Sequence, residues 1–229
     1  MVRDIQILVN VLIEYFPTFL KAFEQNCPFN KFGQLEYHKK TIHIRRELGS
    51  VQAALEDPDF QQNLFETLRV WGIGSRASSL RPFPQFIDAL MTKEDEIMGL
   101  EKMLIDQPNL SVSQVSKKLS RVVCSIDIVT NQAKLVAGSK ALHHILPDLI
   151  VPMDRAYTQN FFGWSNPKFQ YSQSECFEEA FHSFVAIARA VNPEQYVGDG
   201  WNTSGTKVID NALVGVFCGG IELVKSNFS

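Results

Sequence analysis

Apolar residues recur at helical spacing along almost the whole chain. Between Ile5 and Phe16 they lie three and four residues apart, which places them on one face of a helix. The same spacing returns in later stretches. No window shows the sustained alternation, closed by Asn-Gly or Asp-Gly, that is typical of a β-hairpin. The sequence therefore predicts an all-α fold with many helices.

Local signals bound these helices. Pro17 ends or kinks the first helix, because proline lacks the backbone N–H and its ring clashes with the preceding turn. Serine or threonine followed three residues later by an acidic residue or glutamine is the spacing of a capping box. One helix is expected over residues 60–71 and another over 208–217, the latter with Ser204 or Thr206 as its cap. Three more are expected to begin at the capping boxes Thr92/Asp95, Ser111/Gln114 and Ser172/Glu175.

Length and composition indicate a globular protein. The chain has 229 residues, of which 45% are hydrophobic and 21% charged, so it can bury a sizeable core and is neither disordered nor fibrous. No repeat, low-complexity tract or clear linker divides it. We expect a single all-α domain over residues 1–229, with two helical lobes as the alternative arrangement.

The cysteines favour a reducing compartment. Cys27, Cys124, Cys176 and Cys218 lie far apart and form no Cys-x-x-Cys pair, so neither a metal nor another cofactor is expected. Acidic residues near the N-terminus interrupt the continuous apolar stretch that a signal peptide needs, and no apolar stretch is long enough to span a bilayer. The expected location is the cytoplasm, away from membranes. The oligomeric state stays open.

Charge is unevenly distributed. The net charge of −3 excludes a protein coated in positive charge. A local excess of cations nevertheless favours contact with a few nucleic-acid phosphates. Between residues 117 and 155 six basic side chains (Lys117, Lys118, Arg121, Lys134, Lys140 and Arg155) face three acidic ones (Asp127, Asp148 and Asp154).

The segment from Leu135 to Arg155 has a specific polar pattern. Its spacing predicts a short helix that starts near Gly138, with apolar residues on one side. Lys140, His143 and His144 fall together on the other side. Pro147 ends the helix, and an extended run then leads to Asp154. A glycine before a helix lets backbone N–H groups approach a phosphate.

This order of hairpin, glycine, lysine, short helix, apolar run and aspartate resembles the helix-hairpin-helix DNA glycosylases of the endonuclease III type. The resemblance covers roughly residues 135–155. It implies that Gly138 is the hairpin glycine, Lys140 the nucleophile that attacks the sugar C1′, and Asp154 the carboxylate of the site. Only the last glycine of the family's hairpin run is present here, and no cysteine cluster follows. The helix-hairpin-helix element is therefore degenerate and is expected near residues 112–155.

The resemblance predicts a DNA-binding protein and implies the activity of a glycosylase or lyase that acts on a flipped nucleotide. The side chains expected to contact nucleic acid are those around the catalytic pair, namely Gly138, Ser139, His143, His144 and Arg155. Two adjacent histidines make a poor metal pair, because they point about 100° apart on a helix. The opposite interpretation is a solvated helix face followed by a local cap at Asp154.

A second polar segment runs from Trp201 to Asn211. On the helical wheel Lys207, Asp210 and Asn211 share one face, opposite an apolar one. Lys207 and Asn211 are thus further candidates for binding a phosphate or sugar. The alternative is that Trp201 packs and the polar residues only cap the helix. For the whole chain, the alternatives to an enzyme are a catalytically inactive nucleic-acid-binding module and a helical protein-interaction domain.

Overall fold

The computed structural model describes residues 5–74, 79–131 and 134–221. Within these ranges the chain is helical, with one isolated β-bridge between Leu80 and Val129 and no strand. The all-α prediction is confirmed. The α-helices are α1 (Ile5–Glu14), α2 (Phe16–Asn26), α3 (Gln34–Leu48), α4 (Val51–Glu56), α5 (Pro58–Val70), α6 (Phe83–Met91), α7 (Glu94–Met98), α8 (Val112–Ser125), α9 (Lys134–Ile145), α10 (Thr158–Phe161), α11 (Asn166–Tyr171), α12 (Gln173–Val191) and α13 (Gly205–Gly215). A 3₁₀-helix (η1, Pro193–Tyr196) and a π-helical turn (η2, Val216–Gly220) complete the set.

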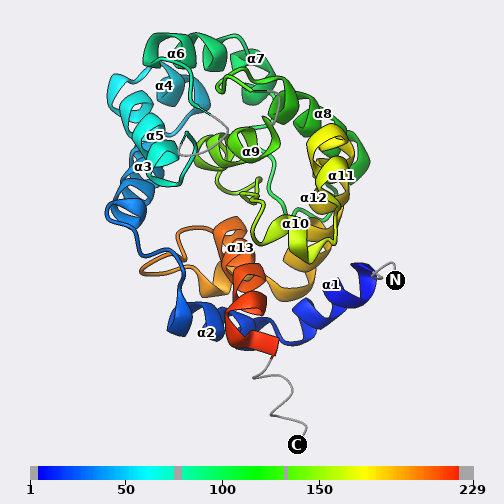
Figure 1. Cartoon of the computed structure of the whole chain (residues 1–229). Coiled ribbons are helices and arrows are strands. Elements are labelled where there is room, and N and C mark those ends of the chain that lie inside the picture. The colour runs from blue at the N-terminus through cyan, green and yellow to red at the C-terminus, as the bar shows by residue number, and fades with distance from the viewer. Residues whose placement is uncertain (1–4, 75–78, 132–133, 222–229) are drawn as a thin grey trace, which may run out of the picture.

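Helix α9 occupies the middle of the molecule (Figure 1). It contacts α3 and α5 on one side and α8 and α12 on the other. Helix α13 packs chiefly against α2, below α9 in the view of Figure 1. One continuous cluster of buried apolar side chains includes residues of α2, α5, α8, α9, α12 and α13, and Ile44 and Leu48 of α3 pack against it. The two segments singled out by the sequence, α9 with its extended continuation and α13, therefore belong to the same core.

Several helix limits follow the sequence signals. Pro17 does interrupt the first helix, which is split into α1 and α2. Ser204 caps α13, because its Oγ accepts from the N–H of Lys207 at 3.3 Å. The prediction that Thr92 and Asp95 form a capping box at the start of a helix is wrong. Thr92 ends α6, and its hydroxyl donates to the carbonyl of Ala89 at 2.8 Å. Ser111 and Ser172 stand at the predicted starts of α8 and α12, but neither side chain makes a capping hydrogen bond.

The expected start of a helix near Gly138 is also wrong. Helix α9 begins at Lys134, so Gly138 lies inside it and its backbone N–H takes part in the hydrogen bonds of the helix. The glycine serves packing instead. A Cβ atom at this position would lie 2.3 Å from the carbonyl oxygen of Val123 in α8. Gly138 therefore allows α8 and α9 to approach closely, and it does not act as a hairpin glycine.

No single helix in the described part of the chain is long and apolar enough to cross a membrane. Helices α1 and α2 pass that test only as a pair, and they meet at a bend of 80°.

Candidate active site

A pocket with aromatic walls opens where α9, α13 and the start of α3 meet. The space inside it that is open to the centres of water-sized molecules is about 40 Å³. Lys140 and Asp154 both line it, although they come from a helix and from the turn that follows the extended run. The other lining residues are Phe29, Gln34, Trp71, Pro152, Met153, Trp201, Lys207 and Asp210.

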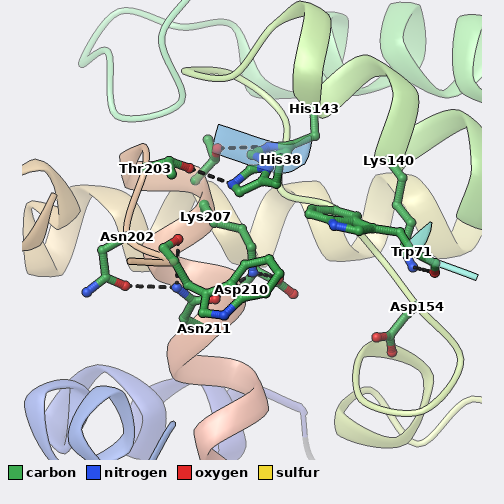
Figure 2. A network of polar contacts seen from close by, with 12 residues as sticks. His38, Trp71, Lys140, His143, Asp154, Asn202, Thr203, Lys207, Asp210 and Asn211 are labelled. Carbon is green, nitrogen blue, oxygen red and sulfur yellow. Dashed lines mark hydrogen bonds and ion pairs between the residues drawn. The ribbon is translucent and has the colours of Figure 1, made fainter. Parts of the chain in front are cut away.

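Lys140 reaches the pocket from the middle of α9. Its Nζ donates to the backbone carbonyl of Trp71 at 3.3 Å and lies 5.6 Å from the centre of the Trp71 ring (Figure 2). Burial lowers the pKa of this amine, the nearby Lys207 lowers it further, and the carboxylates of Asp154 and Asp210 partly oppose the shift. A lowered pKa increases the fraction of neutral amine, which is the nucleophilic form.

Asp154 follows the extended run from α9 and is half-buried at the pocket. Its Oδ1 accepts from the N–H of Tyr157 at 2.6 Å, and its own N–H donates to Thr158 Oγ1 at 3.0 Å. The local cap expected as the alternative role is thus present. Because these bonds also fix the turn, they hold the carboxylate at the pocket wall, below Lys140 in Figure 2.

Lys207 is enclosed by aromatic rings. Its ammonium lies 5.8, 5.1, 5.8 and 5.2 Å from the ring centres of Phe23, Phe29, Trp71 and Trp201. Such cation–π contacts are strongest where water is excluded, and Lys207 is only 1% exposed. Of these four rings, those of Phe29, Trp71 and Trp201 line the pocket together with Lys207.

Two polar partners complete the surroundings of Lys207. Its Nζ donates to Asp210 Oδ2 at 2.6 Å and to Asn211 Oδ1 at 2.5 Å. Asn211 in turn donates to Asn202 Oδ1 at 2.8 Å and to the carbonyl of Trp201 at 3.1 Å. Burial raises the pKa of Asp210, while the lysine opposes that shift. The ion pair therefore satisfies a buried charge, and Asn211 links Lys207 to the backbone of Trp201.

A chain of buried histidines lies behind the pocket. His38 Nδ1 is 2.9 Å from His144 Nε2, and His38 Nε2 is 2.7 Å from Thr203 Oγ1. His144 Nδ1 is 2.7 Å from the carbonyl oxygen of Lys140. Burial lowers the pKa of both histidines, that of His144 to about 4, so both rings are neutral near pH 7. His38 was not singled out by the sequence, since nothing near it in the chain marks its partners.

The remaining predicted contacts lie inside the protein. Ser139, His143 and His144 have no exposed surface, and Asn211 has none either. Ser139 Oγ accepts from the N–H of Met153 at 3.1 Å, which ties the extended run to α9. His143 Nδ1 lies 2.8 Å from the carbonyl of Ile150. These residues therefore support the site from behind.

Arg155 is the exception among the predicted contacts. Its side chain is exposed, and its guanidinium lies 5.9 Å from the ring centre of Phe169, outside the pocket lining. Among the described residues no group of three or more histidine, cysteine or acidic side chains is arranged to hold a metal.

No protein-family model, curated protein or solved structure matches this chain. The chemistry of the site is therefore inferred from its own geometry.

Proposed function

We propose that the chain is a DNA glycosylase with lyase chemistry, which acts on a nucleotide rotated out of a DNA duplex. One observation carries this proposal: Lys140 and Asp154 line the same aromatic-walled pocket. An amine with a lowered pKa beside a carboxylate suits attack on a sugar carbon that develops positive charge. The aromatic walls suit a planar base, because enzymes of this kind bind flipped bases by stacking.

In the proposed reaction the neutral Lys140 Nζ forms a bond to C1′ while the bond from C1′ to the base breaks. The base leaves with the electron pair and takes up a proton. Asp154 stabilises the positive charge that the sugar carries in the transition state. The attached nitrogen then loses a proton, and the bond from C1′ to O4′ breaks. O4′ takes up a proton, and a protonated imine links Lys140 to the opened sugar.

Helix α8 supplies the proposed contacts with the DNA backbone. Lys117, Lys118 and Arg121 are all exposed on it. The α9 residues that were predicted to contact nucleic acid are buried and cannot reach the DNA backbone. Contacts of this kind release counterions, so binding is expected to weaken as salt rises. In this proposal α8 and α9 fill the place of the helix-hairpin-helix element.

Borohydride trapping tests the chemistry, since hydride reduces the imine to a stable amine and leaves protein joined to DNA. A duplex with one abasic site is the substrate, and Lys140→Ala is expected to abolish the product. Lys102→Ala removes an exposed lysine outside the pocket and is expected to trap like the parent. If Lys140→Ala traps as well as the parent, Lys140 is not the nucleophile.

The second candidate is a nucleic-acid-binding module without chemistry. The hydrogen bonds that Lys140 and Asp154 make within the protein favour this module, because Lys140 donates to the Trp71 carbonyl and Asp154 accepts from the N–H of Tyr157. Salt-dependent DNA binding without a trapped product would support this module. If the protein binds neither DNA nor RNA at low salt, both candidates fail and a helical protein-interaction domain takes their place.

A further inference from the structure

The pocket is closed in this structure. The 40 Å³ that it offers to the centres of water-sized molecules would hold roughly three water molecules. The base of a nucleotide is far larger than that, so it cannot enter while the walls stay where they are. One wall must therefore move before the pocket takes a ligand of this size.

The two tryptophans of the pocket wall are fixed by hydrogen bonds. Trp71 follows α5 directly, and its Nε1 donates to the carbonyl of Gln34 at 3.2 Å. The carbonyl of Trp201 accepts from Asn211 Nδ2 at 3.1 Å, and the same amide donates to Oδ1 of the neighbouring Asn202 at 2.8 Å. Movement of either tryptophan therefore breaks hydrogen bonds to another segment of the chain.

Phe29 is the aromatic wall that lacks such ties. It lies in the segment that joins the end of α2 at Asn26 to the start of α3 at Gln34. Among the described residues, the backbone of 28–32 forms hydrogen bonds only inside this segment and with Gln34. Gly33 ends the segment, and a glycine backbone changes its φ and ψ angles with little steric penalty. The segment can therefore move while every hydrogen bond to α5, α9 and α13 stays intact.

Contacts with aromatic rings and with an ammonium hold Phe29 in its closed position. Its ring centre lies 5.3 Å from that of Trp201 and 5.8 Å from that of Phe23, and the Nζ of Lys207 lies 5.1 Å away. Phe29 is only partly buried, so it also faces solvent. It thus lies between solvent and the interior of the pocket.

We propose that Phe29 is a gate, whose segment swings away from Trp201 to admit a nucleotide and returns when the pocket is empty. That the ligand is a nucleotide rests on the proposed function, whereas the gate itself rests on the size of the pocket and the bonding of its walls. The closed form admits no nucleotide, so the apparent affinity is lowered in proportion to the fraction of molecules that are open. Contacts made only in the closed form therefore oppose binding, and their removal strengthens it.

Reductive alkylation of Lys140 by two aldehydes of different size tests the gate without DNA. The neutral amine adds to the aldehyde carbonyl and loses water, and cyanoborohydride delivers hydride to the protonated imine, which leaves a stable secondary amine. Formaldehyde is small enough for the closed pocket, whereas benzaldehyde, a planar ring of the size of a pyrimidine, needs the open one. Peptide mass spectrometry measures the initial rate at each lysine, and the exposed Lys102 serves as the reference.

Removal of the gate is expected to favour the larger reagent. Phe29→Ala is expected to raise the rate of benzaldehyde labelling at Lys140, relative to Lys102, about tenfold, because the ring contacts that close the pocket are lost. The formaldehyde rate is expected to stay within about twofold, because this reagent already enters the closed pocket. Phe29→Leu, which keeps an apolar side chain, is expected to give an intermediate rise. Partial unfolding would raise both rates together, so their ratio separates the gate from a loss of structure.

Phe32→Ala is the matched control. Phe32 lies in the same segment, but its side chain is 101% exposed and does not line the pocket. It is expected to leave both rates at Lys140 unchanged. Borohydride trapping supplies a second readout: Phe29→Ala is expected to trap an abasic single strand faster than the parent, since this substrate has no base at the site that could lose a stacking contact with the missing ring.

The labelling and the trapping can fail separately. If Phe29→Ala raises the two labelling rates by the same factor, or changes neither, the gate is wrong and the proposed function is judged by trapping alone. If benzaldehyde labels Lys140 of the parent as fast as Lys102, the pocket is already open and the gate is wrong as well. If the parent traps no abasic strand but the labelling rates behave as expected, the proposed function fails, and the gate admits a ligand other than a nucleotide.

Discussion

His38 in α3 and His144 in α9 are joined by a hydrogen bond of 2.9 Å between Nδ1 and Nε2, across 106 residues of sequence. Its direction follows from the neighbours. His144 Nδ1 faces a carbonyl oxygen, so it carries the proton and leaves Nε2 as an acceptor. His38 Nδ1 must then donate, and its Nε2 accepts from the hydroxyl of Thr203. A single run of hydrogen bonds thus leads from the loop at Thr203 to the backbone of Lys140.

Removal of His38 is expected to destabilise the protein. His38→Ala leaves a cavity and deprives both His144 and Thr203 of a buried partner, with an expected loss of about 3 kcal/mol. Urea unfolding followed by circular dichroism measures the difference. His43→Ala is the control on the same helix, since its side chain is 68% exposed and pairs with the similarly exposed Glu47. Its expected effect is within about 0.5 kcal/mol. Equal losses in the two variants would contradict a structural role for the histidine chain.

The buried histidines predict a loss of stability in mild acid. Burial holds the pKa of His144 at about 4 and lowers the pKa of His38 and His143 as well. A group whose pKa is lower in the folded state takes up its proton first in the unfolded chain, so stability present above pH 6.5 falls as the pH drops. His144 alone is expected to contribute a loss of about 2 kcal/mol between pH 7 and pH 5.

The acid effect is measured by urea unfolding at pH 7, 6 and 5. His38→Gln keeps a polar side chain without a titrating ring, so its loss over this range is expected to be smaller than that of the parent. Asp210 works in the opposite direction, because burial raises the pKa of its carboxyl. A free energy of unfolding that does not change between pH 7 and pH 5 would show that the histidines are not held neutral.

The helices themselves were predictable because their signals are local. The apolar spacing of residues 60–71 and 208–217 comes close to α5 and α13, and Ser204 was one of two expected caps. Gly138 was misread for a physical reason: a glycine marks either a turn or a close approach of two backbones, and only the three-dimensional contact with Val123 separates these.

The site was predictable only in part. Lys140, Asp154 and Lys207 were named from patterns within short segments, and the structure brings all three to one pocket. His38, Phe29 and Gln34 were not named, because their partners are remote in sequence and no local pattern records a tertiary contact. The burial of His143 and His144 was missed likewise, since a polar helix face is normally solvated.

Gly138→Ala tests the close approach of α8 and α9. The added Cβ would lie 2.3 Å from the Val123 carbonyl oxygen, so one helix must shift, at an expected cost of about 1–3 kcal/mol. Gly198→Ala is the matched control, because a Cβ there has nothing within 4 Å. It is expected to change the free energy of unfolding by less than about 0.5 kcal/mol. A neutral Gly138→Ala would show that the contact with Val123 relaxes freely.

The buried pair of Lys207 and Asp210 predicts a coupled effect on stability. Lys207→Met removes the ammonium from its aromatic surroundings and leaves the Asp210 carboxyl buried without its partner, so a loss of about 3–5 kcal/mol is expected. The double variant Lys207→Met, Asp210→Asn no longer buries a charge, so it is expected to recover at least half of that loss. Urea unfolding of the parent, both single variants and the double variant completes the cycle. Additive single effects would mean that the two side chains act independently, whereas the hydrogen bond of 2.6 Å between them requires coupling.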